Sequence, residues 1–497
     1  MSPMPKMRVI IAGGGSAGWC VAAALGRHLG PRLDITLVES EDIGIVGVGE
    51  ATIPTVRTFH RLLGIDERDF MRASNATFKL GIAFENWARD GDRYIHAFGE
   101  IGKSNWMAPF HHFWLQARSE GYGGDLEDYC FELQAAEAGK FQTGPNSRLN
   151  YAYHFDAVLY GKFLRTFSER HGVKRLEGRI ERVEQDPDTG FITALSLNDD
   201  RRIEGDLFID CTGFRGLLIE EALKTGYDDW SHWLPTDRAL AVQTQSHGPL
   251  MPYTRAIAHG DGWRWRIPLQ NRVGNGLVYC SQTLSDEDAR TRLLGLLDTP
   301  TLTEPRLIRY QTGSRRKVWN KNCVALGLSS GFIEPLESTS IHLFQIGVTR
   351  LIQFFPFGGI TETLADHYNQ MSRNELERVR DFVILHYKLT ERDDSEFWRN
   401  RRDMDIPDTL SHRIELFRDT GHAWQAPDDL FRVDSWLQVL RGQRLEPARW
   451  HHLGAMMSRP QAETAFTGLK RTIDQAVAAL PDHEAFLKSY CALTEPA

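Results

Sequence analysis

Residues 7–18 read MRVIIAGGGSAG, an apolar run that ends in a glycine-rich turn. The apolar run predicts a buried strand, and the residues after the turn predict a helix packed closely against it. Gly13 permits the tight turn out of the strand, Gly15 lets a pyrophosphate approach the backbone, and Gly18 lets the helix approach the sheet. The order of strand, turn and helix predicts a dinucleotide-binding βαβ unit.

The residues around this turn extend the same prediction. A helix that begins near Ser16 and Ala17 directs its unpaired amides toward phosphate groups. A second apolar run, residues 34–39, ends in Glu39, whose carboxylate is expected to accept hydrogen bonds from a ribose. The Gly- and Pro-rich stretch 43–55, IGIVGVGEATIPT, is expected to be a loop near the cofactor.

Composition limits the function further. The 497 residues allow two or three domains, or one large α/β core. The 58 basic and 66 acidic residues give a net charge of −8, which offers no basic field for nucleic acid. The six cysteines lack CxxC or metal-ligand spacing and are expected to be reduced thiols of a cytoplasmic protein without a metal. The start, MSPMPKM, lacks an apolar targeting core, and no stretch predicts a membrane span.

Later elements favour a flavin over a nicotinamide cofactor. A helix over 156–171, strands at 179–185 and 191–197, and a strand at 206–210 that leads into CTGFRG are expected. This order is similar to that of flavoprotein monooxygenases and favours FAD over NAD. We expect a core over 1–355 with an inserted, substrate-covering sheet at about 238–320. A helical subdomain follows at 356–497, with Ser372 and Glu375 as a capping box.

The stretch 263–268, WRWRIP, narrows the chemistry. In a strand, Trp263 and Trp265 project from the same face, which by itself is typical of core aromatics. Together with the flavin-type signature, the motif resembles the hallmark of the flavin-dependent halogenases, the family that includes the tryptophan halogenases. Six motifs occur in the family's order: GGGSAGW, GVGEATIPT, the segment ending in Lys79, DCTGFRG, WRWRIP and GFIEPLEST.

The resemblance implies an α/β fold with an FAD-binding, Rossmann-like core of the flavoprotein monooxygenase type, a mixed-sheet substrate region and a helical C-terminal subdomain. It implies that WRWRIP, with Trp263, Trp265, Ile267 and Pro268, separates the flavin from the organic substrate. The cofactor-binding residues that it implies are Gly13, Gly15, Ser16, Ala17, Gly18, Glu39, Gly49, Glu50, Ala51, Asp210 and Gly327.

The catalytic residues come from the same resemblance. Composition alone predicts that Lys79 is a solvated lysine and that Glu337 is an acid in the first turn of a helix. The resemblance implies instead that Lys79 receives hypohalous acid and that Glu337 polarises it or takes the ring proton. The backbone amides of Thr339 and Ser340 correspond to the family's halide site. Many tryptophan halogenases have glycine where this chain has Ser340.

The substrate residues implied are His96 and Phe98, which match the pair that packs an indole ring, and Trp450. Residues 441–452, RGQRLEPARWHH, lack the tyrosine pair that grips the amino acid part of tryptophan. We therefore expect an indole or a simple indole derivative as substrate, and bromide to be used at least as readily as chloride.

The implied reaction uses reduced FAD, delivered by a separate NAD(P)H-dependent reductase, together with O2 and a halide. A homodimer remains an alternative to a monomer. Two other functions stay open at this stage. One is a single-component flavin monooxygenase that hydroxylates an aromatic, and the other is a noncatalytic flavin carrier that retained the fold.

Overall fold

The computed structural model describes residues 6–42, 49–104, 107–145 and 147–492. Its chain contacts divide it into two compact units, each assembled from three separate stretches of sequence. Unit 1 contains Met1–Ala76, Phe155–Asp237 and Arg309–Glu377, and unit 2 contains Thr77–His154, Arg238–Ile308 and Arg378–Ala497.

Unit 1 contains the predicted βαβ unit. Strand β1 (Met7–Ala12) pairs in parallel with β2 (Leu33–Glu39) on one side and with β12 (Leu207–Asp210) on the other. The six-stranded sheet has the order β20-β21-β12-β1-β2-β8, with β20 (Trp319–Asn320) and β8 (Lys174–Glu177) at its edges and β21 (Cys323–Ala325) next to β20. This mostly parallel sheet confirms the predicted Rossmann-like core.

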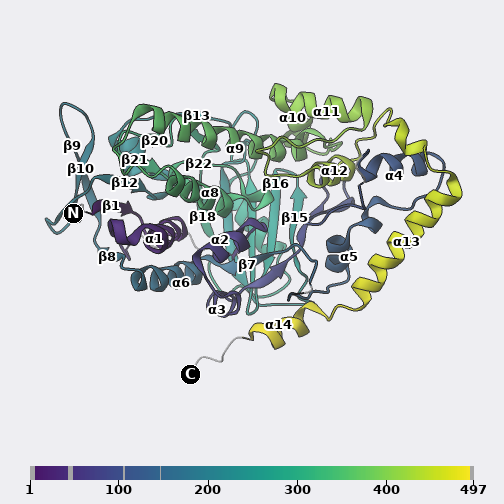
Figure 1. Cartoon of the computed structure of the whole chain (residues 1–497), viewed down its shortest axis with the longest axis horizontal. Coiled ribbons are helices and arrows are strands. Elements are labelled where there is room, and N and C mark those ends of the chain that lie inside the picture. The colour runs from purple at the N-terminus through teal and green to yellow at the C-terminus, as the bar shows by residue number, and fades with distance from the viewer. Residues whose placement is uncertain (1–5, 43–48, 105–106, 146, 493–497) are drawn as a thin grey trace. The chain divides into compact units, whose positions relative to one another are not determined.

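The helices of unit 1 bury apolar faces against this sheet and against one another. Helix α1 (Ser16–Leu29) contacts both α6 (Ala157–Arg170) and α8 (Ser340–Gln353) (Figure 1). The strands predicted at 179–185 and 191–197 are confirmed as β9 (Ile180–Gln185) and β10 (Ile192–Leu197), which form a three-stranded sheet with β11 (Arg202–Glu204). Other elements of unit 1 are β3 (Gly49–Ala51), α2 (Thr55–Leu63), α3 (Glu67–Ala73), β13 (Tyr227–Asp229), β19 (Gly313–Arg315) and β22 (Gly331–Phe332).

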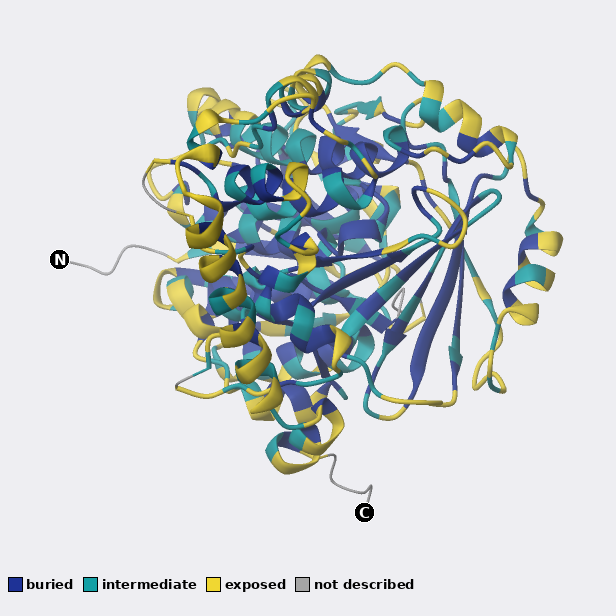
Figure 2. Ribbon diagram, turned by 90° about the vertical axis from the view of Figure 1, so that its right-hand side faces the viewer, coloured by how far each residue is buried: buried dark blue, intermediate teal, exposed yellow. Residues whose placement is uncertain are grey.

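Unit 2 is built on a seven-stranded mixed sheet with the order β18-β14-β17-β16-β15-β5-β6. Strand β16 (Gly262–Pro268), which carries WRWRIP, is an inner strand between β17 (Val273–Tyr279) and β15 (Tyr253–His259). Every residue of β17 is buried, as the long dark blue strands of Figure 2 illustrate. The other strands are β18 (Arg306–Arg309), β14 (Arg238–Thr244), β5 (Gly81–Glu85) and β6 (Arg93–Ala97).

A short strand, β4 (Thr77–Lys79), carries Lys79 and lies just before β5 in the chain. Strand β4 pairs antiparallel with β7 (Ala152–Asp156), with Thr77 opposite His154 and Lys79 opposite Ala152. Because residues alternate between the two faces of a strand, Phe78 and Tyr153 project away from these four residues. Phe78 stacks on Phe141 with ring centroids 4.0 Å apart, so this opposite face is aromatic.

The C-terminal region is helical, as predicted, but the compact units do not separate after residue 355. The long helix α9 (Glu362–Lys388) is divided after Glu377, and residues 378–497 belong to the unit that contains the WRWRIP sheet. The helices of unit 2 are α4 (Phe110–Ser119), α5 (Phe131–Glu137), α7 (Asp286–Gly295), α10 (Glu396–Asp403), α11 (Asp408–Thr420), α12 (Val433–Gly442), α13 (Arg459–Ala478) and α14 (His483–Cys491).

Two local predictions are wrong. Ser372 and Glu375 do not cap a helix, because both lie inside α9, where their side chains bind Arg350. Residues 49–51 of the expected loop form strand β3, and helix α2 begins at Thr55. Residues 43–48 of that loop lie outside the described residues.

Two findings concern the cysteines and the helices. All six cysteines are buried and free. Within the described ranges, every helix is too short or too polar to cross a lipid bilayer.

Candidate functional site

The glycine turn of unit 1 is packed closely at two positions and open at a third. Gly13 has φ of +106°, and a Cβ there would lie 2.3 Å from the carbonyl oxygen of Cys211. A Cβ on Gly18 would lie 1.9 Å from the carbonyl oxygen of Gly13. A Cβ on Gly15, by contrast, would meet nothing within 4 Å. The turn therefore excludes side chains where α1 meets the sheet and leaves space in front of Gly15.

The start of α1 has features of an anion site. Gly15 is its N-cap and provides no side-chain cap, and the first turn contains no acidic residue. The first amides of the helix thus have no partner from a capping side chain. Ser16 directs its hydroxyl elsewhere, to the carbonyl of Ala157 at 3.4 Å.

Glu39 lies beside this turn, at the end of β2. A Cβ on Gly14 would lie 1.5 Å from Glu39 Oε2, so the carboxylate contacts the turn directly. The carboxylate accepts hydrogen bonds from Trp19 Nε1, at 3.3 Å, and from the Arg175 guanidinium. An open anion site at a helix start, next to a fixed carboxylate, fits the pyrophosphate and ribose of FAD.

Asp210 and Gly327 shape the region behind the turn. The fully buried carboxylate of Asp210 accepts from the amide and hydroxyl of Thr212 and from the amides of Leu218 and Ile219, at 2.7–2.9 Å. Four protein donors use its acceptor capacity, so Asp210 holds the DCTGFRG turn together. Gly327 has φ of +73°, and a Cβ there would lie 2.7 Å from the Cβ of Ala17.

Gly49, Glu50 and Ala51 form strand β3 of unit 1. Burial raises the pKa of Glu50 to about 7. A carboxyl group with that pKa is only partly ionised at neutral pH, so it can donate as well as accept a hydrogen bond.

Glu337 and the residues after it lead into α8 in unit 1. Glu337 is buried at the end of a short 3-10 turn, and Ser338 adopts a left-handed φ of +59°. Thr339 is the N-cap of α8, and its buried Oγ1 has no hydrogen-bond partner among the described residues. The amides of Ser340 and the rest of the first turn lack acceptors within the helix. An orphaned hydroxyl beside unpaired amides fits a small anion.

A hydrogen-bonded network two residues further along α8 was not anticipated from the sequence. His342 Nδ1 lies 3.0 Å from Thr55 Oγ1, and His342 Nε2 lies 3.1 Å from Glu375 Oε1. Arg350 donates to the other oxygen of Glu375 at 2.8 Å. This network attaches Thr55, the last residue of GVGEATIPT, to the helix that begins at the candidate anion site.

Lys79 and Phe98 lie together in unit 2. Lys79 is fully buried, and its Nζ lies 5.3 Å from the centre of the Phe98 ring. Phe98 is only partly buried, and its amide donates to the carbonyl of Leu80 at 2.9 Å. His96 packs instead among aromatic side chains, with its ring 5.5 Å from that of Phe382. The structure thus brings Lys79 and Phe98 side by side and corrects the expectation that Lys79 is solvated.

The two tryptophans of WRWRIP are buried on the same strand. Their ring centres are 6.1 Å apart at an interplanar angle of 57°. Trp265 covers Gly276 on β17, where a Cβ would lie 2.0 Å from the indole. Trp265 Nε1 is buried without a partner in the part of the chain that the structure describes. Ile267 is buried as well, and Pro268 ends the strand.

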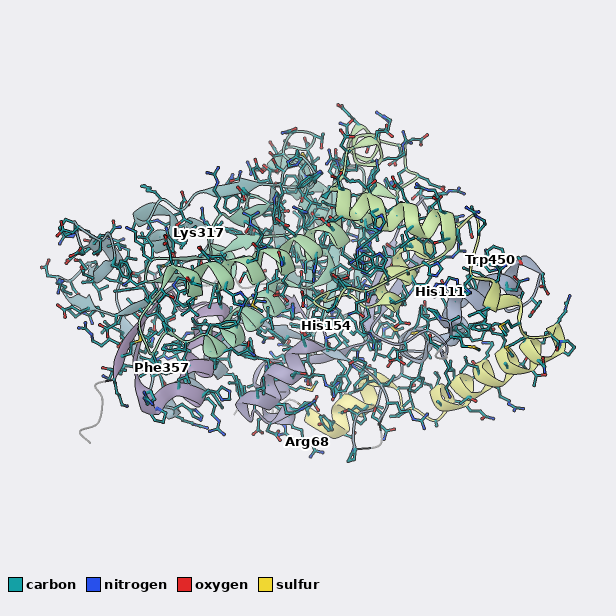
Figure 3. The ribbon with its side chains drawn as sticks, turned by 45° about the horizontal axis from the view of Figure 1, so that its top comes forward. Arg68, His111, His154, Lys317, Phe357 and Trp450 are labelled. Carbon is teal, nitrogen blue, oxygen red and sulfur yellow. The ribbon has the colours of Figure 1, made fainter. Side chains whose placement is uncertain are left out.

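Trp450 belongs to a different part of unit 2, near α4. Its Nε1 donates to Gln116 Oε1 at 2.9 Å, and His111, labelled with Trp450 in Figure 3, lies on the same helix as Gln116. His112 contacts His422 and His451, and burial, followed by the charges of nearby histidines, lowers its pKa to about 3. Within the described ranges, no group of three or more His, Cys, Asp or Glu residues could hold a metal ion.

A cavity of about 410 Å³ in unit 2 is lined by Glu446, which belongs to the stretch 441–452. Its wall is largely neutralised by ion pairs within the protein. Glu446 pairs with Arg441 and lies 3.8 Å from Arg118. Both arginines lie over the Trp114 ring, with guanidinium-to-centroid distances of 5.4 and 5.3 Å.

Comparisons with known proteins identify the family of this chain. The family model described as "Tryptophan halogenase" matches residues 8–459. The tryptophan 6-halogenase SttH of Streptomyces toxytricini is 37% identical over 440 residues, covering 83% of this chain and 84% of that protein. The tryptophan 7-halogenase RebH of Lentzea aerocolonigenes is 36% identical over 444 residues, covering 84% and 83%.

Solved structures extend the likeness to nearly the whole chain. A flavin-dependent halogenase from Xanthomonas campestris has a TM-score of 0.97 and 51% identity, covering 99% of this chain and 100% of that one. BrvH, a flavin-dependent halogenase from Brevundimonas sp. BAL3, has a TM-score of 0.94 and 42% identity, covering 98% and 100%. The chain therefore belongs to the tryptophan halogenase family, whose members are flavin-dependent enzymes that use reduced FAD.

Proposed function

We propose that this halogenase uses bromide or chloride to halogenate a free indole-type aromatic, through hypohalous acid delivered to Lys79 and Glu337. The observation that carries the proposal is the position of Lys79. A lysine without solvent exposure, with its amine 5.3 Å from the centre of a partly exposed aromatic ring, is suited to a small electrophile and an arene. Reduced FAD from a separate reductase, with O2, supplies the oxidising power when bound.

The chain's own residues bind the dinucleotide and the halide, direct the electrophile and accept the ring proton. Gly15, the first amides of α1 and Glu39 hold the dinucleotide, and Trp263 and Trp265 separate it from the arene. Thr339 and Ser340 hold the halide through the orphaned hydroxyl and the first amides of α8. Lys79 directs the electrophilic halogen to the ring, and Glu337 accepts the ring proton that the new carbon–halogen bond displaces.

Two features support an indole over free tryptophan. Residues 441–452 contain no tyrosine, and Glu446 is paired with Arg441. The tryptophan halogenases named above are 36–37% identical, whereas the flavin-dependent halogenases from Xanthomonas and Brevundimonas are 51% and 42% identical. Phe98 remains the candidate ring for stacking on the arene, because His96 is buried among other aromatics.

Mass spectrometry of the purified protein tests this proposal. The reaction contains FAD, NADH, a flavin reductase, air, bromide or chloride, and either indole or tryptophan. Halogen isotope patterns on indole, with little product from tryptophan, are expected. Halogenated tryptophan as the main product would refute the substrate assignment, and a hydroxylated product that forms without halide would refute the role of Lys79 and Glu337.

A further inference from the structure

His154 lies beside Lys79 on the polar face of a strand pair. In the antiparallel pair of β4 and β7, Thr77 is opposite His154 and Lys79 is opposite Ala152. Residues directly opposite one another share a face, as do residues two apart along one strand. The side chains of Thr77, Lys79 and His154 therefore project from one face, and all three are fully buried. Figure 3 labels His154.

Hydrogen bonds assign the tautomer of His154. The Thr77 hydroxyl donates its single proton to the carbonyl of Pro268 at 2.7 Å. Thr77 Oγ1, 2.9 Å from His154 Nδ1, must then accept, so Nδ1 carries a proton. His154 Nε2 lies 2.9 Å from Thr254 Oγ1 and accepts from that hydroxyl when the imidazole is neutral.

The surroundings of the imidazole favour this neutral form. Burial lowers the pKa of His154 well below its usual value, and the charges of Lys79 and His483 lower it further. The other groups that face it are the hydroxyls of Thr77 and Thr254, which carry no charge. Protonation of His154 would place a second positive charge near the Lys79 amine.

The hydrogen bonds connect four strands, one of which is β7, the strand of His154 itself. Thr77 belongs to the strand of Lys79, and Pro268 ends the WRWRIP strand β16. Thr254 belongs to β15, which pairs with β16 on one side and with β5 on the other. The strand that carries Lys79 is therefore attached to the tryptophan strand by one hydroxyl, and His154 fixes the direction in which that hydroxyl donates.

We propose that His154 is a positioning residue for Lys79: as a neutral imidazole it donates to Thr77, locks Thr77 onto Pro268 and so sets the place of the lysine amine. This inference rests on the proposed role of Lys79 in halogen delivery. His154 touches neither halide nor arene in this role, and no proton leaves it during turnover. Loss of the Thr77 bond displaces the amine, and hypohalous acid then escapes without halogenating the substrate.

Two amide variants each keep one of the two hydrogen bonds of His154 and remove the other. The amide nitrogen of His154→Asn occupies the place of Nδ1 and still donates to Thr77. The amide oxygen of His154→Gln occupies the place of Nε2 and accepts only from Thr254. Both variants lose the imidazole and one hydrogen bond, so each is a control for the other.

The readout is the coupling, which is the amount of halogenated product formed per reduced flavin oxidised. The coupling is measured as a function of pH, and the melting temperature of each variant is measured as well. We expect His154→Asn to keep at least about half of the wild-type coupling and His154→Gln to lose about tenfold, with similar melting temperatures. The pH profile of His154→Asn should match that of the wild type, because His154 does not titrate in turnover. Equal coupling in the two variants, or a shifted pH profile, would overturn the proposal.

A second pair of variants guards against a folding defect. Thr77→Val and Thr254→Val each remove one buried hydroxyl without a change of shape, but only Thr77 belongs to the strand of Lys79. Coupling should fall about tenfold in Thr77→Val and less than about threefold in Thr254→Val. If wild-type protein yields no halogenated arene at all, the proposed function itself fails. If the wild type halogenates and both valine variants couple equally, only the positioning role fails.

Discussion

Substitution of Thr339 by valine should make the protein more stable and a poorer binder of halide. Thr339 Oγ1 is buried at the start of α8 without a hydrogen-bond partner among the described residues. Valine has the same shape, and the backbone of Thr339, with φ of −89° and ψ of −12°, does not strain it. The variant therefore removes a buried hydroxyl that nothing within the described ranges satisfies.

The magnitudes follow from the cost of that hydroxyl. A buried polar group without a partner costs about 1–3 kcal/mol, so the halide-free variant should gain about 1 kcal/mol in its free energy of unfolding. With halide bound, the hydroxyl donates to an anion, and such a bond contributes about 1.5–3 kcal/mol. Its loss should weaken halide binding roughly 10- to 100-fold, while the backbone amides retain part of the affinity.

Urea unfolding measures both effects without flavin or substrate. The free energy of unfolding is compared in bromide and in a non-halide salt of equal ionic strength. A wild-type site filled at ten times its Kd stabilises the fold by about 1.4 kcal/mol, and the variant should show little of this gain.

Thr349→Val is the matched control for this substitution. Thr349 lies on the same helix, and its hydroxyl already donates to the carbonyl of Gln345 at 2.8 Å. This variant should not gain stability and should keep the response to bromide. A Thr339→Val protein that is less stable than wild type, or that responds to bromide as wild type does, would refute the halide site.

Three further substitutions or conditions test other parts of the molecule. Lys79→Ala should abolish halogenated product while reduced flavin is still oxidised by O2; product at the normal rate, measured by mass spectrometry, would contradict its role. Gly276→Ala would place a Cβ 2.0 Å from the Trp265 indole, so it should cost about 1–3 kcal/mol and shift tryptophan fluorescence, and unchanged stability would show that the ring moves freely. Acid should destabilise the protein, because burial lowers the pKa of His111 and His483 to about 4 and that of His112 to about 3. Between about pH 6.5 and pH 4 the folded state therefore binds fewer protons than the unfolded state, and the free energy of unfolding falls as the pH is lowered. Each histidine should cost about 2 kcal/mol of stability at about pH 5. A urea midpoint that stays constant between about pH 6.5 and pH 4 would contradict the predicted loss.

The glycine turn could be predicted because its causes are local. Gly13, Gly15 and Gly18 act within one turn of chain, and the strand and helix on either side are specified by neighbouring residues. The division into units could not be predicted in the same way. Strand β5 pairs in parallel with β15, with Gly81 opposite Tyr253, and no local pattern reports a pairing over that separation.

The false capping box shows how one local pattern serves two structures. Ser372 and Glu375 have the spacing of a helix start, yet the helix runs from Glu362 to Lys388. Arg350 on α8 donates to both side chains and thereby satisfies them inside the helix. Arg350 is not part of the capping-box spacing, so that spacing alone cannot show that the two side chains are satisfied inside a helix.

Some buried polar side chains in this chain have hydrogen-bond partners within the protein, and others have none among the described residues. Asp210 accepts four hydrogen bonds from its own turn, so it has little capacity left for a ligand. Thr339 is equally buried but has no partner among the described residues, and that costs stability unless something else binds there. Both residues occur in motifs shared with the halogenases, so resemblance alone gave both a role at the site. The hydrogen-bond count separates them: the partners of Asp210 belong to its own turn, whereas the Thr339 hydroxyl carries a desolvation cost that an anion at the proposed halide site would remove.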